Sequence, residues 1–157
     1  NYEPYGTASK PLFLDAWKAF EDKDCKTAMK KSTESLKINY INFALHTVRS
    51  QCLKEAGDQS GADRELAIGK GLAQSLLGTG DGKSLKTAYV VVTMGEEKAV
   101  LANLGFSEEQ QSLLTDNGHQ YDSISGHDEQ GKMQTALVNV DALFYGLAKE
   151  LQQGKHP

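Results

Sequence analysis

Residues 78–93 read Gly-Thr-Gly-Asp-Gly-Lys-Ser-Leu-Lys-Thr-Ala-Tyr-Val-Val-Val-Thr, and this stretch divides the chain into two unlike halves. The glycines at its start end any preceding helix. The β-branched run at 88–93 is short and predicts a buried strand. We therefore expect a single domain over 1–157, with helical hairpins in 1–79 and an α+β part in 80–157.

The part before the break has the periodicity of amphipathic helices. Apolar residues recur at three- and four-residue spacing in four segments, about 11–22, 26–38, 43–56 and 62–77. Asn42 is a candidate N-cap of the third helix. Asp24 and Asp58 end similar stretches, each followed by a helix, and they are 34 residues apart, the period of a tetratricopeptide helix hairpin. The pattern predicts two tetratricopeptide-like helical hairpins.

The part after the break mixes strands and helices. The expected order is a strand at 88–93, a helix at 96–104, a short helix from Ser107, strands at 119–125 and 133–140, and a helix from Asp141. The two consecutive strands should form an antiparallel hairpin to which the first strand adds. The predicted fold class is α+β, mostly α, with a small antiparallel sheet of about three strands.

The two cysteines, Cys25 and Cys52, stand in neither a redox motif nor a zinc motif. If they lie on antiparallel helices joined near Asn39, their heights along the helix axis differ by only about 3 Å. Helix geometry therefore allows a disulfide, and two free buried thiols are the other interpretation. A disulfide would indicate an oxidising compartment.

Charge and hydropathy exclude several classes of function. Lys and Arg together number 17 and Asp and Glu 21, for a net charge of −4, which argues against nucleic acid as the main partner. No apolar run approaches the roughly 20 residues that span a bilayer. The first nine residues contain no signal region, and we expect that a signal peptide has been removed.

The sequence Gly80-Asp81-Gly82-Lys83-Ser84 ends like a phosphate-binding P-loop. A P-loop also needs a glycine where this chain has Leu77, and it follows a strand rather than a helix. We interpret the segment as a turn between a helix and a strand. No cofactor is expected.

Polar side chains gather over 116–129, around the predicted strand 119–125 and in the turn that follows it, and form the candidate partner-binding cluster: Asp116, Asn117, His119, Asp122, His127, Asp128 and Glu129. His119 and His127 are weak candidates for metal ligands. No complete catalytic motif is present.

Two further sets of ionisable residues have simple structural interpretations. Glu96 and Glu97 could form an acid–base pair, but neighbouring helical side chains point about 100° apart. Their place at a helix start suits the helix dipole instead. His46 is interpreted as a histidine at the edge of the core.

Several stretches together resemble the domain-of-unknown-function family 4919, a family of exported bacterial proteins. The likeness covers about 12–150 and is carried by Leu36-Lys37-Ile38-Asn39 with His46, by Gly80-Asp81-Gly82-Lys83-Ser84 before Ala88-Tyr89-Val90-Val91, by Gly95-Glu96-Glu97-Lys98-Ala99-Val100-Leu101 with Leu104-Gly105 and Gln110-Gln111, and by Tyr121-Asp122. The chain departs from the family at Lys98 and at Leu137-Val138-Asn139. The resemblance implies a tetratricopeptide-like start and an exported setting, and it implies no activity.

These observations favour an exported protein-binding module, periplasmic or secreted, over an enzyme. One concrete form is an immunity-type inhibitor of a secreted toxin. The alternatives are a small hydrolase or metal-dependent enzyme that uses His119, Asp122 and His127, and a structural envelope protein. The expected partner is another protein.

Overall fold

The structure is a computed structural model that describes residues 8–152, with side chains described as far as residue 146. The chain divides into two compact units, with the boundary between Gln74 and Ser75. Within residues 8–152, none of the helices combines the length and the apolar character that crossing a membrane requires.

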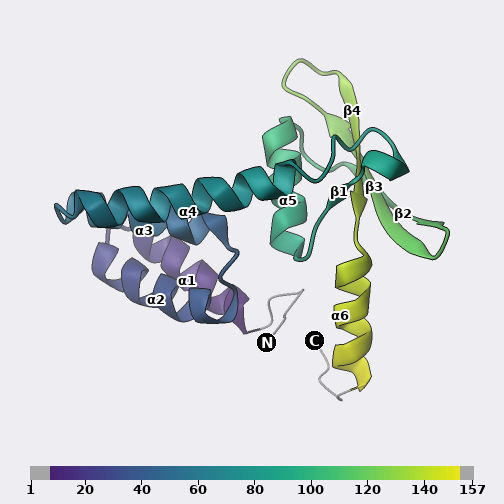
Figure 1. Cartoon of the computed structure of the whole chain (residues 1–157). Helices are drawn as coiled ribbons and strands as arrows, with labels where there is room; N and C mark the ends of the chain where they lie inside the picture. The colour runs from purple at the N-terminus through teal and green to yellow at the C-terminus, as the bar shows by residue number, and fades with distance from the viewer. Residues whose placement is uncertain (1–7, 153–157) are drawn as a thin grey trace. The chain divides into compact units, whose positions relative to one another are not determined.

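The first unit is helical, as the periodicity predicts (Figure 1). Its helices are α1 (Ser9–Glu21), α2 (Cys25–Ile38), α3 (Phe43–Glu55) and α4 (Gln59–Leu77), the last of which crosses the unit boundary. Helix α1 packs on α2, and α2 packs on α3. Asp24 caps α2 by accepting from the Thr27 amide, and the predicted Asn42 cap of α3 is confirmed by its bond from the Leu45 amide. The tetratricopeptide-like arrangement stays a prediction.

Small apolar side chains bring these helices together. One buried cluster contains Ala16, Leu36 and Leu45, and a second contains Ala19, Ala28, Val48 and Cys52. Alanine at helix contacts lets two backbones approach closely, and burial of the larger side chains supplies most of the stabilising free energy.

The second unit holds one sheet and two helices (Figure 1). Its elements are β1 (Tyr89–Val90), α5 (Met94–Leu104), β2 (Gln110–Asp116), β3 (His119–His127), β4 (Met133–Asn139) and α6 (Asp141–Gln152). A 3-10 turn, Leu85–Thr87, precedes β1. The sheet order is β1-β4-β3-β2. The predicted hairpin of β3 and β4 is confirmed, with Tyr121 opposite Asn139.

Two details of the predicted sheet are wrong. The sheet has four strands and is mixed, because β1 pairs with β4 in parallel while the other strands pair antiparallel. The short helix expected from Ser107 does not form, and β2 occupies that part of the chain. Strand β2 has no buried face, so its side chains do not alternate between apolar and polar. The sequence feature that could have predicted β2 is Asn117-Gly118, because Asn-Gly favours a two-residue hairpin turn between two strands.

The β2–β3 turn has the backbone that such a hairpin needs. Asn117 has φ 48° and Gly118 has φ 85°, so both central residues are left-handed. This is the type I′ geometry whose twist matches that of the flanking strands. The core of the sheet lies on β3 and β4, where Ile124 and Val138 are fully buried.

Candidate functional site

The predicted polar cluster is split between the two ends of β3. Asp116, Asn117 and His119 lie at the β2–β3 turn, whereas His127, Asp128 and Glu129 lie where β3 leads into β4. A strand advances about 3.3 Å per residue, so His119 and His127 are about 26 Å apart. They cannot ligate one ion, and they cannot serve one active site together with Asp122. These residues are close in sequence but not in space, because an extended strand separates its ends. A role of either group of residues in binding a partner stays a prediction.

His119 belongs to a structural contact at one end of β3. Its Nδ1 lies 2.6 Å from Asp141 Oδ2, and the Gln120 amide donates to Asp141 Oδ1 at 2.6 Å. Burial acts to raise the pKa of Asp141, but hydrogen bonds from Gln120, His119 and Asn139 outweigh it and lower the pKa. Asp141 therefore ties the start of α6 to the hairpin.

His127 and Asp128 complete the other end of the strand. His127 Nδ1 lies 2.9 Å from Glu109 Oε2. Asp128 accepts from the amides of Gln130 and Lys132, which closes the turn toward β4. Within residues 8–152, no group of three or more His, Cys, Asp or Glu side chains is arranged to hold a metal ion.

Two carboxyl groups whose pairing no sequence pattern indicates, those of the buried Glu97 on α5 and the half-buried Asp122 on β3, interact in the structure. Glu97 is 1% exposed. Burial, the Asp122 charge and a hydrogen bond to Asp122 raise the pKa of Glu97 to about 7. Gln111 of β2 donates to Asp122 Oδ2 at 2.6 Å, so the pair is linked to the outermost strand.

The neighbouring Glu96 lies at the start of α5, as the sequence indicated, and it also caps the helix. The Thr93 side chain accepts from the Glu96 amide, and the Glu96 carboxylate accepts from the Thr93 amide, forming a capping box. Glu97 instead shares the buried face of α5 with Val100 and Leu101. The spacing of three and four residues from Glu97 to Val100 and Leu101 is the sequence pattern that indicates that Glu97 points inward.

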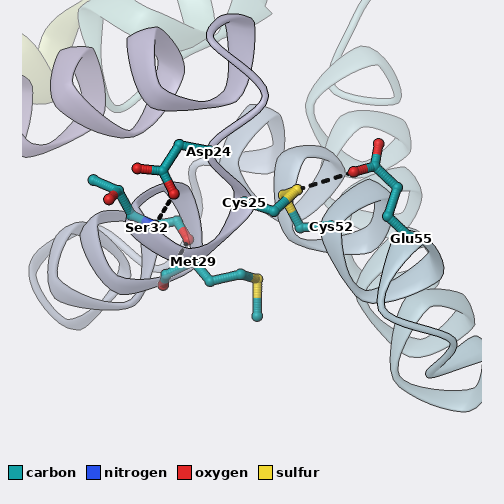
Figure 2. Close-up of a disulfide and its surroundings, with 7 residues drawn as sticks. Asp24, Cys25, Met29, Ser32, Cys52 and Glu55 are labelled. Atoms are coloured by element: carbon teal, nitrogen blue, oxygen red, sulfur yellow. Dashed lines mark hydrogen bonds between the residues drawn. A yellow bond between two sulfur atoms is a disulfide. The ribbon is translucent and has the colours of Figure 1, made fainter.

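The Cys25–Cys52 disulfide is confirmed, and it joins the first residue of α2 to α3 (Figure 2). The two Cα atoms are 5.3 Å apart. Glu55 Oε2 lies 3.4 Å from Cys25 Sγ, and because a disulfide sulfur carries no proton this is a contact without donation. Glu55 thus places a negative charge beside the bridge. Disulfides form and persist in oxidising compartments, so the bridge is consistent with a location outside the cytoplasm.

The family model of a domain of unknown function, DUF4919, matches residues 1–153. The chain belongs to the DUF4919 family. No curated protein and no solved structure matches the sequence significantly. Because the family description assigns no activity, the function of this DUF4919 protein has to be argued from its own residues.

The Gly-Asp-Gly-Lys-Ser segment of the DUF4919 chain is closed by its own hydrogen bonds. The amides of Asp81 and Gly82 both donate to the Thr87 carbonyl, at 2.9 and 2.8 Å. Asp81 Oδ1 accepts from the Lys83 amide and the Thr87 hydroxyl. A P-loop instead presents such amides to a phosphate. The segment is a structural turn that leads into β1.

Replacing Gly80 by alanine is expected to destabilise the DUF4919 protein by about 1–3 kcal/mol. A Cβ at position 80 would lie 2.2 Å from the Thr87 carbonyl oxygen and 2.6 Å from that of Ala88, so the backbone would have to move. Gly71→Ala is the matched control, because a Cβ there meets nothing within 4 Å. It should stabilise α4 by up to about 1 kcal/mol. Urea unfolding of both variants tests this, and equal effects would contradict it.

The first unit of the DUF4919 chain holds a buried ionic network. His46 is 1% exposed, and its Nδ1 lies 2.7 Å from Glu65 Oε2 while its Nε2 lies 2.9 Å from the Tyr40 carbonyl oxygen. Arg49 Nε donates to Glu65 Oε1 at 2.8 Å, and Arg49 also donates to Thr33. The network joins α2, α3 and α4. His46 lies inside the core rather than at its edge, and both of its ring nitrogens have a partner.

Proposed function

We propose that this DUF4919 protein is an exported, non-enzymatic protein-binding module that binds an extended segment of another protein along β2. The observation that carries the proposal is the exposure of this strand. All seven residues of β2 are exposed, and β2 lies at the end of the sheet order with β3 as its one neighbour.

The hairpin register determines which backbone groups of β2 are open. A two-residue turn makes the closing pair, Asp116 and His119, a hydrogen-bonded pair. Hydrogen-bonded and non-hydrogen-bonded pairs then alternate, so Gln111, Leu113 and Thr115 direct their N–H and C=O groups away from β3. The Val140 amide donates to the Gln120 carbonyl, so that carbonyl points toward β4 and away from β2. Because Gln120 opposes Thr115, this bond supports the assignment of Thr115 and Gln120 as a non-hydrogen-bonded pair.

Strand β2 also lacks the usual protection of an edge. Many proteins prevent an edge strand from pairing with another chain by placing lysine, proline or a β-bulge in that strand. Between Gln110 and Asp116 there is no Lys, Arg or Pro, and Asp116 at the end is the one charged residue. Leu113 and Leu114 are 51% and 39% exposed. An open edge with apolar side chains is the surface that binds a partner strand in β-augmentation.

The disulfide supports the exported setting, periplasmic or secreted. An immunity-type inhibitor of a secreted toxin is one specific form of the proposal, in which β2 and its turn would pair with the toxin. The geometry does not favour the hydrolase alternative. His119 and His127 are far apart and each is paired with a carboxylate. Glu97 is fully buried and cannot touch a substrate.

The variant Leu113→Lys tests the proposal, because a charge at the centre of β2 opposes strand addition without removing a bond to β3. Tagged protein is used to capture partners from the host's own extract under oxidising conditions. We expect the stoichiometric partner of the unchanged protein to be retained at least tenfold less. The matched control is Leu14→Lys on α1, which changes a leucine that is 54% exposed.

The outcomes separate the alternatives. Loss of the partner with the Leu113 variant alone supports binding at β2. Equal retention of the partner by both variants contradicts binding at β2. Loss of the partner with the Leu14 variant favours a binding surface on the helical hairpins. Absence of any partner of the unchanged protein favours the structural envelope protein.

A further inference from the structure

The side chain of Glu97 on α5 interacts with that of Asp122 on β3, so two acidic groups come together. Glu97 Oε2 is buried and has no hydrogen-bond partner among the described residues. We propose that Glu97 and Asp122 form a proton-binding site that fastens α5 to β3 while one proton is shared, and that loosens this contact when both carboxyl groups are ionised.

Hydrogen-bond chemistry requires the shared proton. Two carboxylates are both acceptors, so they attract each other only if one of them carries a proton to donate. Asp122 Oδ2 already accepts a hydrogen bond from Gln111 at 2.6 Å. Glu97 is fully buried, where an unpaired charge is costly, so the proton is assigned to Glu97. Its proton bonds to Asp122 and avoids a second negative charge in a buried position.

The surrounding charges act in the same direction. Glu108, in the segment before β2, adds a negative charge that disfavours ionised Glu97. Lys98 carries a positive charge that lowers the pKa of Glu97, but its effect is smaller than those of burial, Asp122 and Glu108. The cross-strand neighbours of Asp122 are Leu113 and Val138, which carry no charge.

The direction of the pH effect follows from the raised pKa. Glu97 has a pKa of about 7 in the folded protein and an ordinary value of 4.5. Between these values the folded chain holds a proton that the unfolded chain has released. Stability therefore falls as pH rises from 4.5 to about 7 and then levels off. The inference is independent of partner binding and is tested on the protein alone.

The first test is urea unfolding at pH 5.5, 7 and 8 for the unchanged protein and Glu97→Gln. Glutamine keeps the shape and can donate to Asp122 without titrating. The unfolding equilibrium constant of the unchanged protein should rise roughly 30-fold from pH 5.5 to pH 8 through this group, and the variant should lack that rise. Glu129→Gln, at an exposed glutamate on the β3–β4 turn, is the matched control and should keep it.

Two measurements on the unchanged protein keep the inference testable if the glutamine variant does not fold. Carbon-13 NMR should show the Glu97 carboxyl titrating near pH 7. Hydrogen exchange, corrected for the intrinsic pH dependence, should show the amides of α5 opening more at pH 8 than at pH 5.5. A Glu97 carboxyl that titrates near pH 4.5, or equal protection of α5 at both pH values, would overturn the inference.

Discussion

Loss of the Cys25–Cys52 disulfide is expected to lower the free energy of unfolding by about 3.5 kcal/mol. The bridge closes a loop with a sequence separation of 27 residues. In the chain-entropy description a loop of this length restricts the unfolded chain by about that amount, within the typical range of about 2–4 kcal/mol. The measurement is equilibrium urea unfolding with and without reductant.

The double variant Cys25→Ala with Cys52→Ala is the control for side effects of the reductant. Its stability should be low under both conditions, because it has no bridge to lose. Thiol counting on denatured, unreduced protein should find no reactive thiol, since both cysteines are bridged. Two reactive thiols, with a stability that reductant does not change, would contradict the bridge and the argument for export.

Replacement of Glu65 by alanine is expected to cost about 3 kcal/mol, the lower end of the range for breaking a buried ion pair. Glu65 contacts both His46 and Arg49, at 2.7 and 2.8 Å. Without the carboxylate, His46 Nδ1 and Arg49 Nε lose their partner inside the protein. The lower end applies because Arg49 is partly exposed and can still be reached by water. Urea unfolding followed by circular dichroism gives the difference.

The matched control is Asp63→Ala on the same helix. Asp63 is exposed and accepts one hydrogen bond, from Gln59, so its loss should change stability by less than about 0.5 kcal/mol. Equal losses for the two variants would contradict a special role of Glu65.

The effect of Glu65 should also depend on pH. Burial acts to raise the pKa of Glu65, but hydrogen bonds from His46 and Arg49 outweigh it and lower the pKa below the ordinary 4.5. The stabilisation is therefore fully present above pH 4.5 and is lost as the pH falls through the lowered pKa. The Glu65→Ala difference should shrink in acid. This is the opposite of the direction expected for Glu97.

The elements that the sequence predicts well are those with one buried face. Helices α1 to α4 and strands β3 and β4 each bury part of their surface, so their apolar residues recur with the period of a helix or a strand. The disulfide could be anticipated because two antiparallel helices bring Cys25 and Cys52 to similar heights.

Strand β2 and the Glu97–Asp122 pair could not be predicted from periodicity. Strand β2 has no buried face and is formed by its turn and by pairing with β3. Glu97 lies on a buried helix face where an acidic residue is rare, because burial of a carboxylate is costly unless it is protonated. The partner that makes this possible, Asp122, is brought near by the tertiary fold alone.

The central claim is that β2 is the partner-binding edge, and site-specific photo-cross-linking tests it most directly. A photoreactive residue is placed in turn at Gln111, Leu113 and Thr115 on β2, and at the exposed Leu14 on α1 for comparison. The protein is irradiated in the host's own extract under oxidising conditions. We expect one partner to be cross-linked from the β2 positions and none from position 14. Cross-links from α1 alone, or from no position while the partner is still captured, would contradict it.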